Sequence, residues 1–287
     1  MSGFRRSSSL GFSSFDNPRN FEEYISSGIK TLDNLIDIVP GAIICIYEDK
    51  FSSIHNTLLQ IFISSCFNEN KKFCILATED KLLKRFNKIK SQKLPEVNND
   101  SLVIAWRYKG LDTSNEHFYW DLLNKLDLEE NYQLRNLENL LEKLKTSVNC
   151  CFAIFSIFSP LYDQFTNQNM NQSQYIHQIF YEIRKYTKLN NHTVIMSLPN
   201  FLYNSNFTLY FDTILQIVNN LSLPQETPLY NCFIEILKLS KPGSLRVNFL
   251  ESYKYGLVLK SKKIEIEKID IKPEETVPKT TGCASNF

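Results

Sequence analysis

The sequence predicts an α/β fold, in which a mostly parallel, twisted sheet is flanked by helices and ends in an antiparallel strand pair. Short, continuous apolar runs alternate along the chain with segments whose apolar residues recur at helical spacing. Such runs are typical of parallel strands that are buried on both faces. Toward the C-terminus two strand-like runs follow each other closely, which indicates a hairpin or an antiparallel edge.

Each expected element corresponds to one of these runs or periodic segments. The strands are expected at 42–47, 73–78, 101–108, 150–158, 192–198, 213–218, 232–239, 253–259 and 263–271. The helices are expected at 52–67, 79–90, 121–145 and 174–189, with a short helical turn at 32–36. The helix at 79–90 would carry a basic face.

The domain organisation follows from composition. Residues 1–20 are rich in Ser and Arg with few core-forming residues, so we expect a disordered arm. Residues 21–272 carry the predicted domain, and 273–287 form a polar tail. The net charge of +1 excludes a strongly basic nucleic-acid binder. Any RNA would be bound by a local patch, or by patches pooled from several chains.

The seven cysteines have no zinc-site spacing, and most lie in apolar runs, so we expect buried thiols that act as small hydrophobic groups. Their odd number fits a reducing compartment. The four histidines are isolated in sequence, and no metal site is predicted. No secretory signal or run of about 20 apolar residues is present. We expect a cytoplasmic protein, with a nuclear location as an alternative, and no membrane partner.

The segment from Ser27 to Leu59 has the layout of a RecA-type nucleotide-binding opening: a Ser-Gly-Ile turn, a Pro-Gly turn, a buried strand, a loop and a helix. A working phosphate-binding loop would supply glycines and a Lys followed by Ser or Thr. Here the strand is followed by Glu48, Asp49 and Lys50, and residues 48–57 contain no glycine. We expect this degenerate loop not to bind triphosphate, and we expect Glu48 and Asp49 to cap the next helix.

The position expected for a second nucleotide-binding motif also argues against nucleotide hydrolysis. A Walker B strand ends in an Asp that organises Mg²⁺. The best candidate strand, 150–158, is followed by no carboxylate until Asp163. The sequence therefore predicts no catalytic residue and no enzyme, although weak ATPase activity of an assembled ring stays open.

Several segments, in the same order along the chain, resemble the PAXNEB family, the family of Elongator complex protein 4. The most specific is Ile104-Ala105-Trp106-Arg107-Tyr108, which is similar to a signature of that family. Weaker similarities lie at 27–33, 47–50, 197–199, 227–230, 259–268 and 282–283. Together they run from about Ser26 to Phe287.

The resemblance implies a RecA-like accessory subunit, without catalysis of its own. The family forms a hetero-hexameric ring with Elongator proteins 5 and 6. That ring is described as binding tRNA and responding to ATP, and it docks on the catalytic Elongator subcomplex. Its role is tRNA wobble-uridine modification of the carboxymethyl type. No cofactor is expected, and binding of ATP at an interface between ring subunits is the alternative.

Candidate interface or RNA contacts follow from the resemblance and from basic clusters. They are Trp106, Arg107, Tyr108, Lys81, Lys84, Arg85, Arg246, Lys260, Lys262 and Lys263. A solvated surface is the alternative for the lysines and arginines, and a core or interface role is the alternative for Trp106. Two other functions stay open: a divergent RecA-class ATPase, and another RecA-like Elongator subunit, protein 5 or 6.

Overall fold

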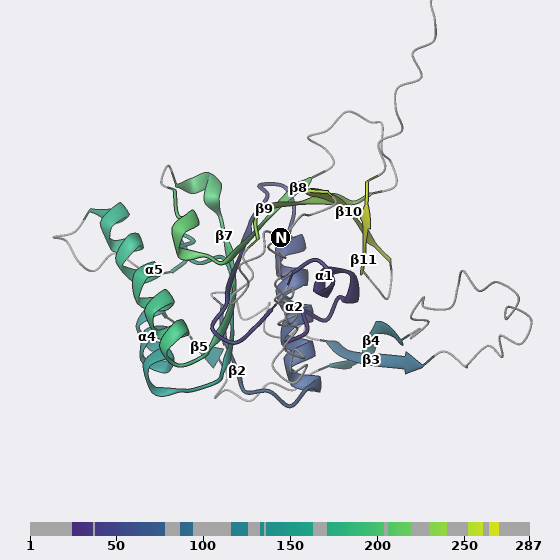
Figure 1. Cartoon of the computed structure of the whole chain (residues 1–287), viewed down its shortest axis with the longest axis horizontal. Coiled ribbons are helices and arrows are strands. Elements are labelled where there is room, and N and C mark those ends of the chain that lie inside the picture. The colour runs from purple at the N-terminus through teal and green to yellow at the C-terminus, as the bar shows by residue number, and fades with distance from the viewer. Residues whose placement is uncertain are drawn as a thin grey trace, which may run out of the picture.

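A computed structural model of the chain describes residues 25–36, 38–77, 87–93, 116–125, 133–134, 136–162, 171–203, 206–219, 230–239, 252–260 and 264–269. Its centre is a nine-stranded sheet with strand order β11-β10-β9-β8-β1-β7-β6-β2-β5 (Figure 1). The strands are β1 (Ile43–Tyr47), β2 (Phe73–Leu76), β5 (Gln133–Leu134), β6 (Cys151–Ile154), β7 (Thr193–Leu198), β8 (Thr213–Asn219), β9 (Cys232–Lys238), β10 (Lys254–Leu259) and β11 (Ile264–Lys268).

The sheet is parallel on one side and antiparallel on the other. The strands from β8 through β1, β7, β6 and β2 to the short β5 all run parallel. The strands β9, β10 and β11 are added to β8 in antiparallel pairing. This arrangement confirms the predicted fold class, including the antiparallel pair near the C-terminus.

Helices cover both faces of the sheet, and each face has its own hydrophobic core. The helices α1 (Lys30–Asp33) and α2 (Ile54–Asn68) lie on one face, and α4 (Leu137–Thr146) and α5 (Gln172–Leu189) lie on the other (Figure 1). Alternation along β1 serves both cores, because Ile44 and Ile46 join the α2 side while Ile43 and Cys45 join the α5 side. The continuous apolar run of β1 is therefore buried on both faces, as expected.

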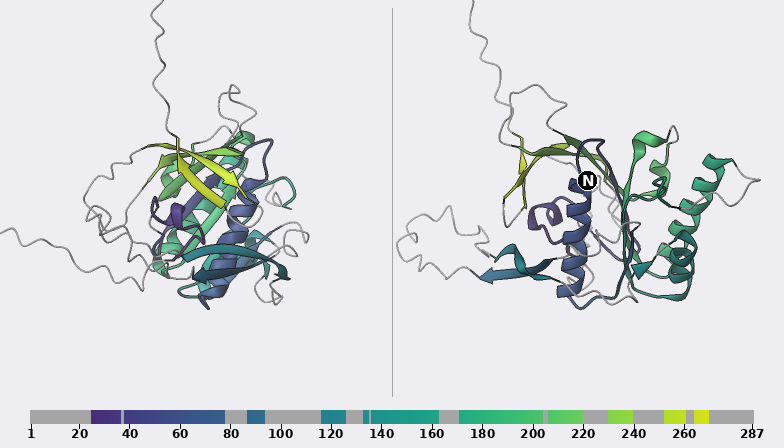
Figure 2. Two further views of the ribbon diagram at one scale, coloured as in Figure 1. Left: turned by 90° about the vertical axis from the view of Figure 1, so that its right-hand side faces the viewer. Right: turned by 180° about the vertical axis from the view of Figure 1, so that it is seen from behind.

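The antiparallel strands curve over the α1 side of the sheet, as the views in Figure 2 show. Buried side chains from β10 and β11 share a core with residues of the 25–36 segment, and α1 contacts β11. The strands thus enclose the first helix, which explains why a helix of only four residues persists.

The structure corrects two predicted helices. Residues 87–93 and 116–125 form an antiparallel pair, β3 (Asn87–Lys93) with β4 (Glu116–Lys125), near α2. The predicted helix at 79–90 is therefore wrong over 87–90, and the predicted helix at 121–145 is wrong over 121–125 and 133–134. The sequence of β4 is rich in aromatic residues, which favour strands, and pairing with a distant segment outweighs local helical periodicity. Residues 137–146 are helical as predicted.

Candidate functional site at the carboxyl edge of the sheet

The degenerate loop lies at the carboxyl end of β1, at a switch point of the sheet. The Glu48 amide donates to the carbonyl oxygen of Leu198 at 3.0 Å, so pairing with β7 continues one residue past β1. The chain then leaves β1 toward α2 on one face, whereas the segment after β7 packs into the core of the other face. In open α/β sheets the crevice formed by such diverging connections is where ligands bind.

The loop after β1 is closed by its own polar groups. The Asp49 carboxylate accepts a hydrogen bond from the Phe51 amide at 2.8 Å, and the Ser52 hydroxyl accepts one from the Ile54 amide at 3.2 Å. Helix α2 begins after Ser53, whose side chain makes no capping hydrogen bond. The expectation that Glu48 and Asp49 cap this helix is wrong, because Asp49 closes the turn and Glu48 faces inward.

The Glu48 carboxylate and the His55 imidazole form a buried pair. Their Oε2 and Nε2 atoms are 3.7 Å apart, and each side chain is only 8% exposed. Among the described residues, Glu48 Oε1 and His55 Nδ1 have no hydrogen-bond partner. Burial lowers the pKa of His55, and the negative charge of Glu48 partly opposes that effect.

Two tyrosines lie near this pair and direct their hydroxyl groups elsewhere. The Tyr162 hydroxyl donates to the Phe155 carbonyl at 2.6 Å, and the Tyr203 hydroxyl donates to the Phe158 carbonyl. Burial raises the pKa of both tyrosines, and the Glu48 charge adds to the effect. The site therefore presents a carboxylate among neutral hydroxyl groups, which is unfavourable for a phosphate.

The position of a Walker B carboxylate is occupied by a backbone turn. After β6, Ser156 and Phe158 adopt left-handed conformations with φ of 46° and 62°. The Ser156 amide donates to the Ser197 hydroxyl at 2.7 Å, and the Ile157 amide donates to the Ser197 carbonyl at 2.9 Å. These bonds hold a conformation that costs about 1–3 kcal/mol per residue in isolation. The turn ties β6 to β7 and supplies no metal ligand.

Lys50 and several apolar side chains form the outer rim of this edge. The Lys50 ammonium lies 5.6 Å from the centroid of the Phe201 ring, which belongs to the 3₁₀ helix η5 (Asn200–Leu202). Phe51 is 74% exposed, Phe201 45% and Leu202 48%. We call Phe51, Phe201 and Leu202 the apolar rim. Because β1 and β7 are parallel neighbours, both loops project from the same edge.

Of the other predicted contact residues, the structure describes Lys260, and it does not lie at this site. Lys260 lies just after β10 and pairs with Glu265 of β11, four strands away from β1. The remaining candidates fall outside the described residues: Lys81, Lys84, Arg85, Trp106, Arg107, Tyr108, Arg246, Lys262 and Lys263. The structure thus brings together Glu48, Asp49 and Lys50, and adds His55 to them.

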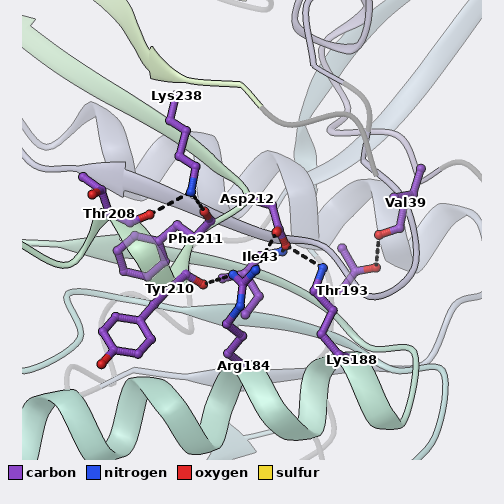
Figure 3. Close-up of polar contacts among 10 residues, drawn as sticks. All are labelled: Val39, Ile43, Arg184, Lys188, Thr193, Thr208, Tyr210, Phe211, Asp212 and Lys238. Atoms are coloured by element: carbon purple, nitrogen blue, oxygen red, sulfur yellow. Dashed lines mark hydrogen bonds and ion pairs between the residues drawn. The ribbon is translucent and has the colours of Figure 1, made fainter. Parts of the chain in front are cut away.

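A second polar cluster, at the opposite end of β1, was missed by the sequence analysis (Figure 3). There the Asp212 carboxylate accepts a hydrogen bond from the Ile43 amide at 3.0 Å and lies 2.9 Å from the Lys188 ammonium and 3.3 Å from the Arg184 guanidinium. The available signal was the i, i+4 spacing of Arg184 and Lys188 on the predicted helix. Asp212 carries no comparable signal in the sequence, because its partners are distant along the chain.

The cysteines are buried as expected. All six that the structure describes are free thiols in the core, and Cys283 lies outside the described residues. Within the described part of the chain, no group of three or more His, Cys, Asp or Glu side chains is placed to hold a metal ion. None of the described helices is long and apolar enough to cross a membrane.

Strand order and loop chemistry together define the class of domain. The five main parallel strands lie in the order fifth, first, fourth, third, second, counted along the chain. This is the order of RecA-like α/β domains, and here the phosphate-loop position is acidic.

Comparison with other proteins adds little beyond this class. No protein-family model matches the sequence, and no curated protein matches it. The structure is similar to the solved ATPase domain of G40P, with a TM-score of 0.45 and 11% identity over 75% of this chain and 83% of that one. A likeness at this level gives no information about activity.

Proposed function

We propose that this chain is a non-catalytic accessory subunit of Elongator. In this proposal it forms a hetero-hexameric RecA-like ring with Elongator proteins 5 and 6, binds tRNA and supports carboxymethyl-type modification of the wobble uridine. The segments that resemble the PAXNEB family, in order from Ser26 to Phe287, support the assignment to Elongator. The observation that carries the non-catalytic role is the buried Glu48 at the phosphate-loop position.

Electrostatics at this position disfavour a nucleotide triphosphate. A working loop offers unpaired amides and a lysine to the phosphates. Here the Phe51 amide is bonded to Asp49 and the Ile54 amide to Ser52. A phosphate at about 4 Å from a carboxylate is repelled by about 1 kcal/mol in water and by several in a drier site. A helix N-terminus compensates for less than about 2 kcal/mol.

The apolar rim supports a role in assembly. Phe51, Phe201 and Leu202 are large, exposed apolar side chains, and their burial against another molecule would be favourable. They surround the same edge at which the loop has lost its phosphate chemistry. An edge that is apolar and lacks a ligand cradle suits contact with a neighbouring subunit.

Co-expression tests this proposal. The chain, produced with homologues of Elongator proteins 5 and 6, should elute as one complex whose mass by light scattering corresponds to a hetero-hexamer. Replacing Phe51→Asp should weaken assembly, because a charge would be placed in the rim. Tyr253→Asp is the matched control, since Tyr253 is 68% exposed and lies just before β10, three strands away from β1. Transfer RNA from cells without the protein should lack carboxymethyl-type wobble-uridine modification by mass spectrometry.

The alternatives predict different results. A monomer in every co-expression, together with unchanged wobble modification, would refute the Elongator role. Single-turnover ATP hydrolysis by the purified chain, lost on Lys50→Ala, would instead support a divergent RecA-class ATPase. Occupation of the position of protein 5 or 6 in the purified ring would indicate another RecA-like Elongator subunit.

A further inference from the structure

Three cationic side chains converge on the amino edge of the sheet, at the end of β1 opposite to Glu48. Arg184 and Lys188 come from α5, and Lys238 comes from β9 (Figure 3). The Arg184 guanidinium also donates to the Tyr210 carbonyl at 2.7 Å. The Lys238 ammonium donates to the carbonyls of Thr208 and Phe211 at 2.9 and 2.6 Å. These bonds hold the three cations in defined positions.

The cluster carries more positive charge than its carboxylate can neutralise. Within the described residues, Asp212 is the carboxylate that these side chains contact, and it pairs with both Arg184 and Lys188. Burial lowers the pKa of Lys238, and the nearby Arg184 charge lowers it further. Cations that repel each other in this way, and that are only partly covered, create a positive potential at the surface.

The cations retain hydrogen-bonding capacity. A guanidinium has five N–H donors and an ammonium has three. Among the described residues, Arg184 uses its two terminal nitrogens on Tyr210 and Asp212, and Lys188 bonds only Asp212. The side chains of Arg184 and Lys188 are 34% and 40% exposed, so an anion from solvent can reach them. Two cations pair with the single Asp212 carboxylate, and Lys238 adds a third positive charge that is held by the backbone carbonyls of Thr208 and Phe211.

An exposed aromatic ring lies on the same stripe of α5. Tyr181 is 60% exposed and precedes Arg184 by three residues and Lys188 by seven, a spacing that places all three on one side of the helix. Tyr181 and Arg184 are separated by about 4.5 Å along the helix axis. A nucleotide base and its own phosphate can span such a separation. Basic groups beside an exposed aromatic ring are typical of sites for single-stranded nucleic acid.

We propose that this stripe of α5, together with Lys238 of β9, binds single-stranded RNA, with Arg184, Lys188 and Lys238 contacting phosphate groups and Tyr181 stacking on a base. The inference deepens the proposed function, since RNA handling is part of it. It places that contact at the amino edge of the sheet, away from the loop at Glu48.

The experiment uses the full-length chain alone, so that it does not depend on ring assembly. Binding of a labelled single-stranded RNA of about 12 nucleotides is followed by fluorescence anisotropy at several salt concentrations. Tyr181→Ala should weaken binding about 5- to 100-fold through lost stacking. Lys188→Gln should lower the slope of log affinity against log salt by about 0.7, as expected for one lost phosphate contact.

Matched controls separate a site from general charge. Lys254→Gln removes the same charge from β10, where Lys254 is 37% exposed and pairs with Glu235 at 3.0 Å, much as Lys188 pairs with Asp212. Tyr253→Ala removes a similarly exposed tyrosine from the bend just before β10. Both should stay within about twofold of the unmodified chain, as surface substitutions elsewhere do. Thermal unfolding of each variant checks that it is folded. If Lys188→Gln is unstable, Tyr181→Ala still tests the site, because Tyr181 is exposed.

Three outcomes would overturn the inference. The first is no measurable binding of RNA by the unmodified chain. The second is an equal loss in the controls and in the two test variants. The third is competition by polyglutamate as strong as by unlabelled RNA, which would indicate an acidic protein partner. Failure of ring assembly with RNA binding intact would refute only the Elongator role, and the reverse result would refute only this site.

Discussion

His192 shows at the residue scale how buried partners decide a protonation state. Its Nδ1 lies 3.1 Å from the Cys150 amide nitrogen and its Nε2 lies 3.0 Å from the Leu144 carbonyl oxygen. An amide can only donate and a carbonyl can only accept, so the ring must be neutral with its proton on Nε2. Protonation of Nδ1 would break the bond to Cys150. Burial lowers the pKa of His192 in agreement with this geometry.

The free energy of unfolding should therefore decrease in acid. Because the folded-state pKa of His192 lies below the ordinary value of about 6.5, the unfolded chain binds more protons in this interval. Stability is complete above that value and is lost as the pH falls through the folded-state pKa. Urea denaturation at about pH 7.5 and 5.5 should show this loss, and His192→Gln should reduce it without abolishing it, since His55 titrates in the same direction. An identical pH dependence in the variant would contradict this account.

Glu48 is the residue whose role was least accessible from sequence. Its acidity was evident, and so was the lack of glycine around it, so the loss of a phosphate loop could be predicted. Its partner was not, because a carboxylate seven residues before a histidine meets it only when the intervening turn closes through Asp49. The choice between capping the helix and facing inward depends on that turn.

At the scale of elements, the antiparallel strands depend on close packing at Gly256. A Cβ atom built at this position of β10 would overlap the ring of Tyr230. The same ring lies 5.8 Å from that of Phe233, the β9 residue paired with Gly256. A glycine in a strand often marks such a close approach, and here the aromatic ring covers the bare backbone.

Gly256→Ala should destabilise the protein by about 1–3 kcal/mol, the usual cost of overpacking. Tyr230→Ala removes the ring that the new methyl group meets, so the double variant should be more stable than the sum of the two single changes predicts. Denaturant unfolding of the four proteins measures this coupling. Strict additivity would mean that the ring moves aside without cost and that the packing at Gly256 is not specific.

The elements that sequence predicted best are those whose signal is local. Helix α5 was expected at 174–189 and runs from Gln172 to Leu189, since its apolar stripe lies within the segment and its Asn171 cap directly precedes the helix. The pair β3–β4 was missed because its stability depends on pairing between segments more than 20 residues apart. The charged residues of 87–90 and 121–125 fit a helical pattern as well as a strand, and no local signal decides between them.

At the scale of the whole molecule, the sheet separates two surfaces. The carboxyl edge carries the Glu48–His55 pair and the apolar rim, whereas the amino edge carries the cations around Asp212. The two lie at opposite ends of β1, which spans five residues or roughly 17 Å. In the proposed ring, one edge would contact neighbouring subunits while the other stays open to RNA. The mostly parallel sheet and its antiparallel C-terminal strands could be predicted from sequence, but the role of Asp212 could not, since its partners come from two other elements.

Because the acidic loop after β1 disfavours phosphate, the Tm of the isolated chain should change little when Mg-ATP is added. Ligand binding stabilises a fold by RT ln(1 + [L]/Kd), which is about 2.7 kcal/mol when the ligand is present at 100 times Kd. For a domain of this size that amounts to a rise in Tm of roughly 5–10 °C. With a Kd no tighter than about 1 mM, addition of about 1 mM Mg-ATP gives at most about 0.4 kcal/mol and a rise of under about 2 °C. The Glu48→Gln variant serves as the comparison, because it removes the buried carboxylate while keeping a similar shape. A rise above about 5 °C in the unmodified chain would show that a phosphate cradle forms despite the acidic loop.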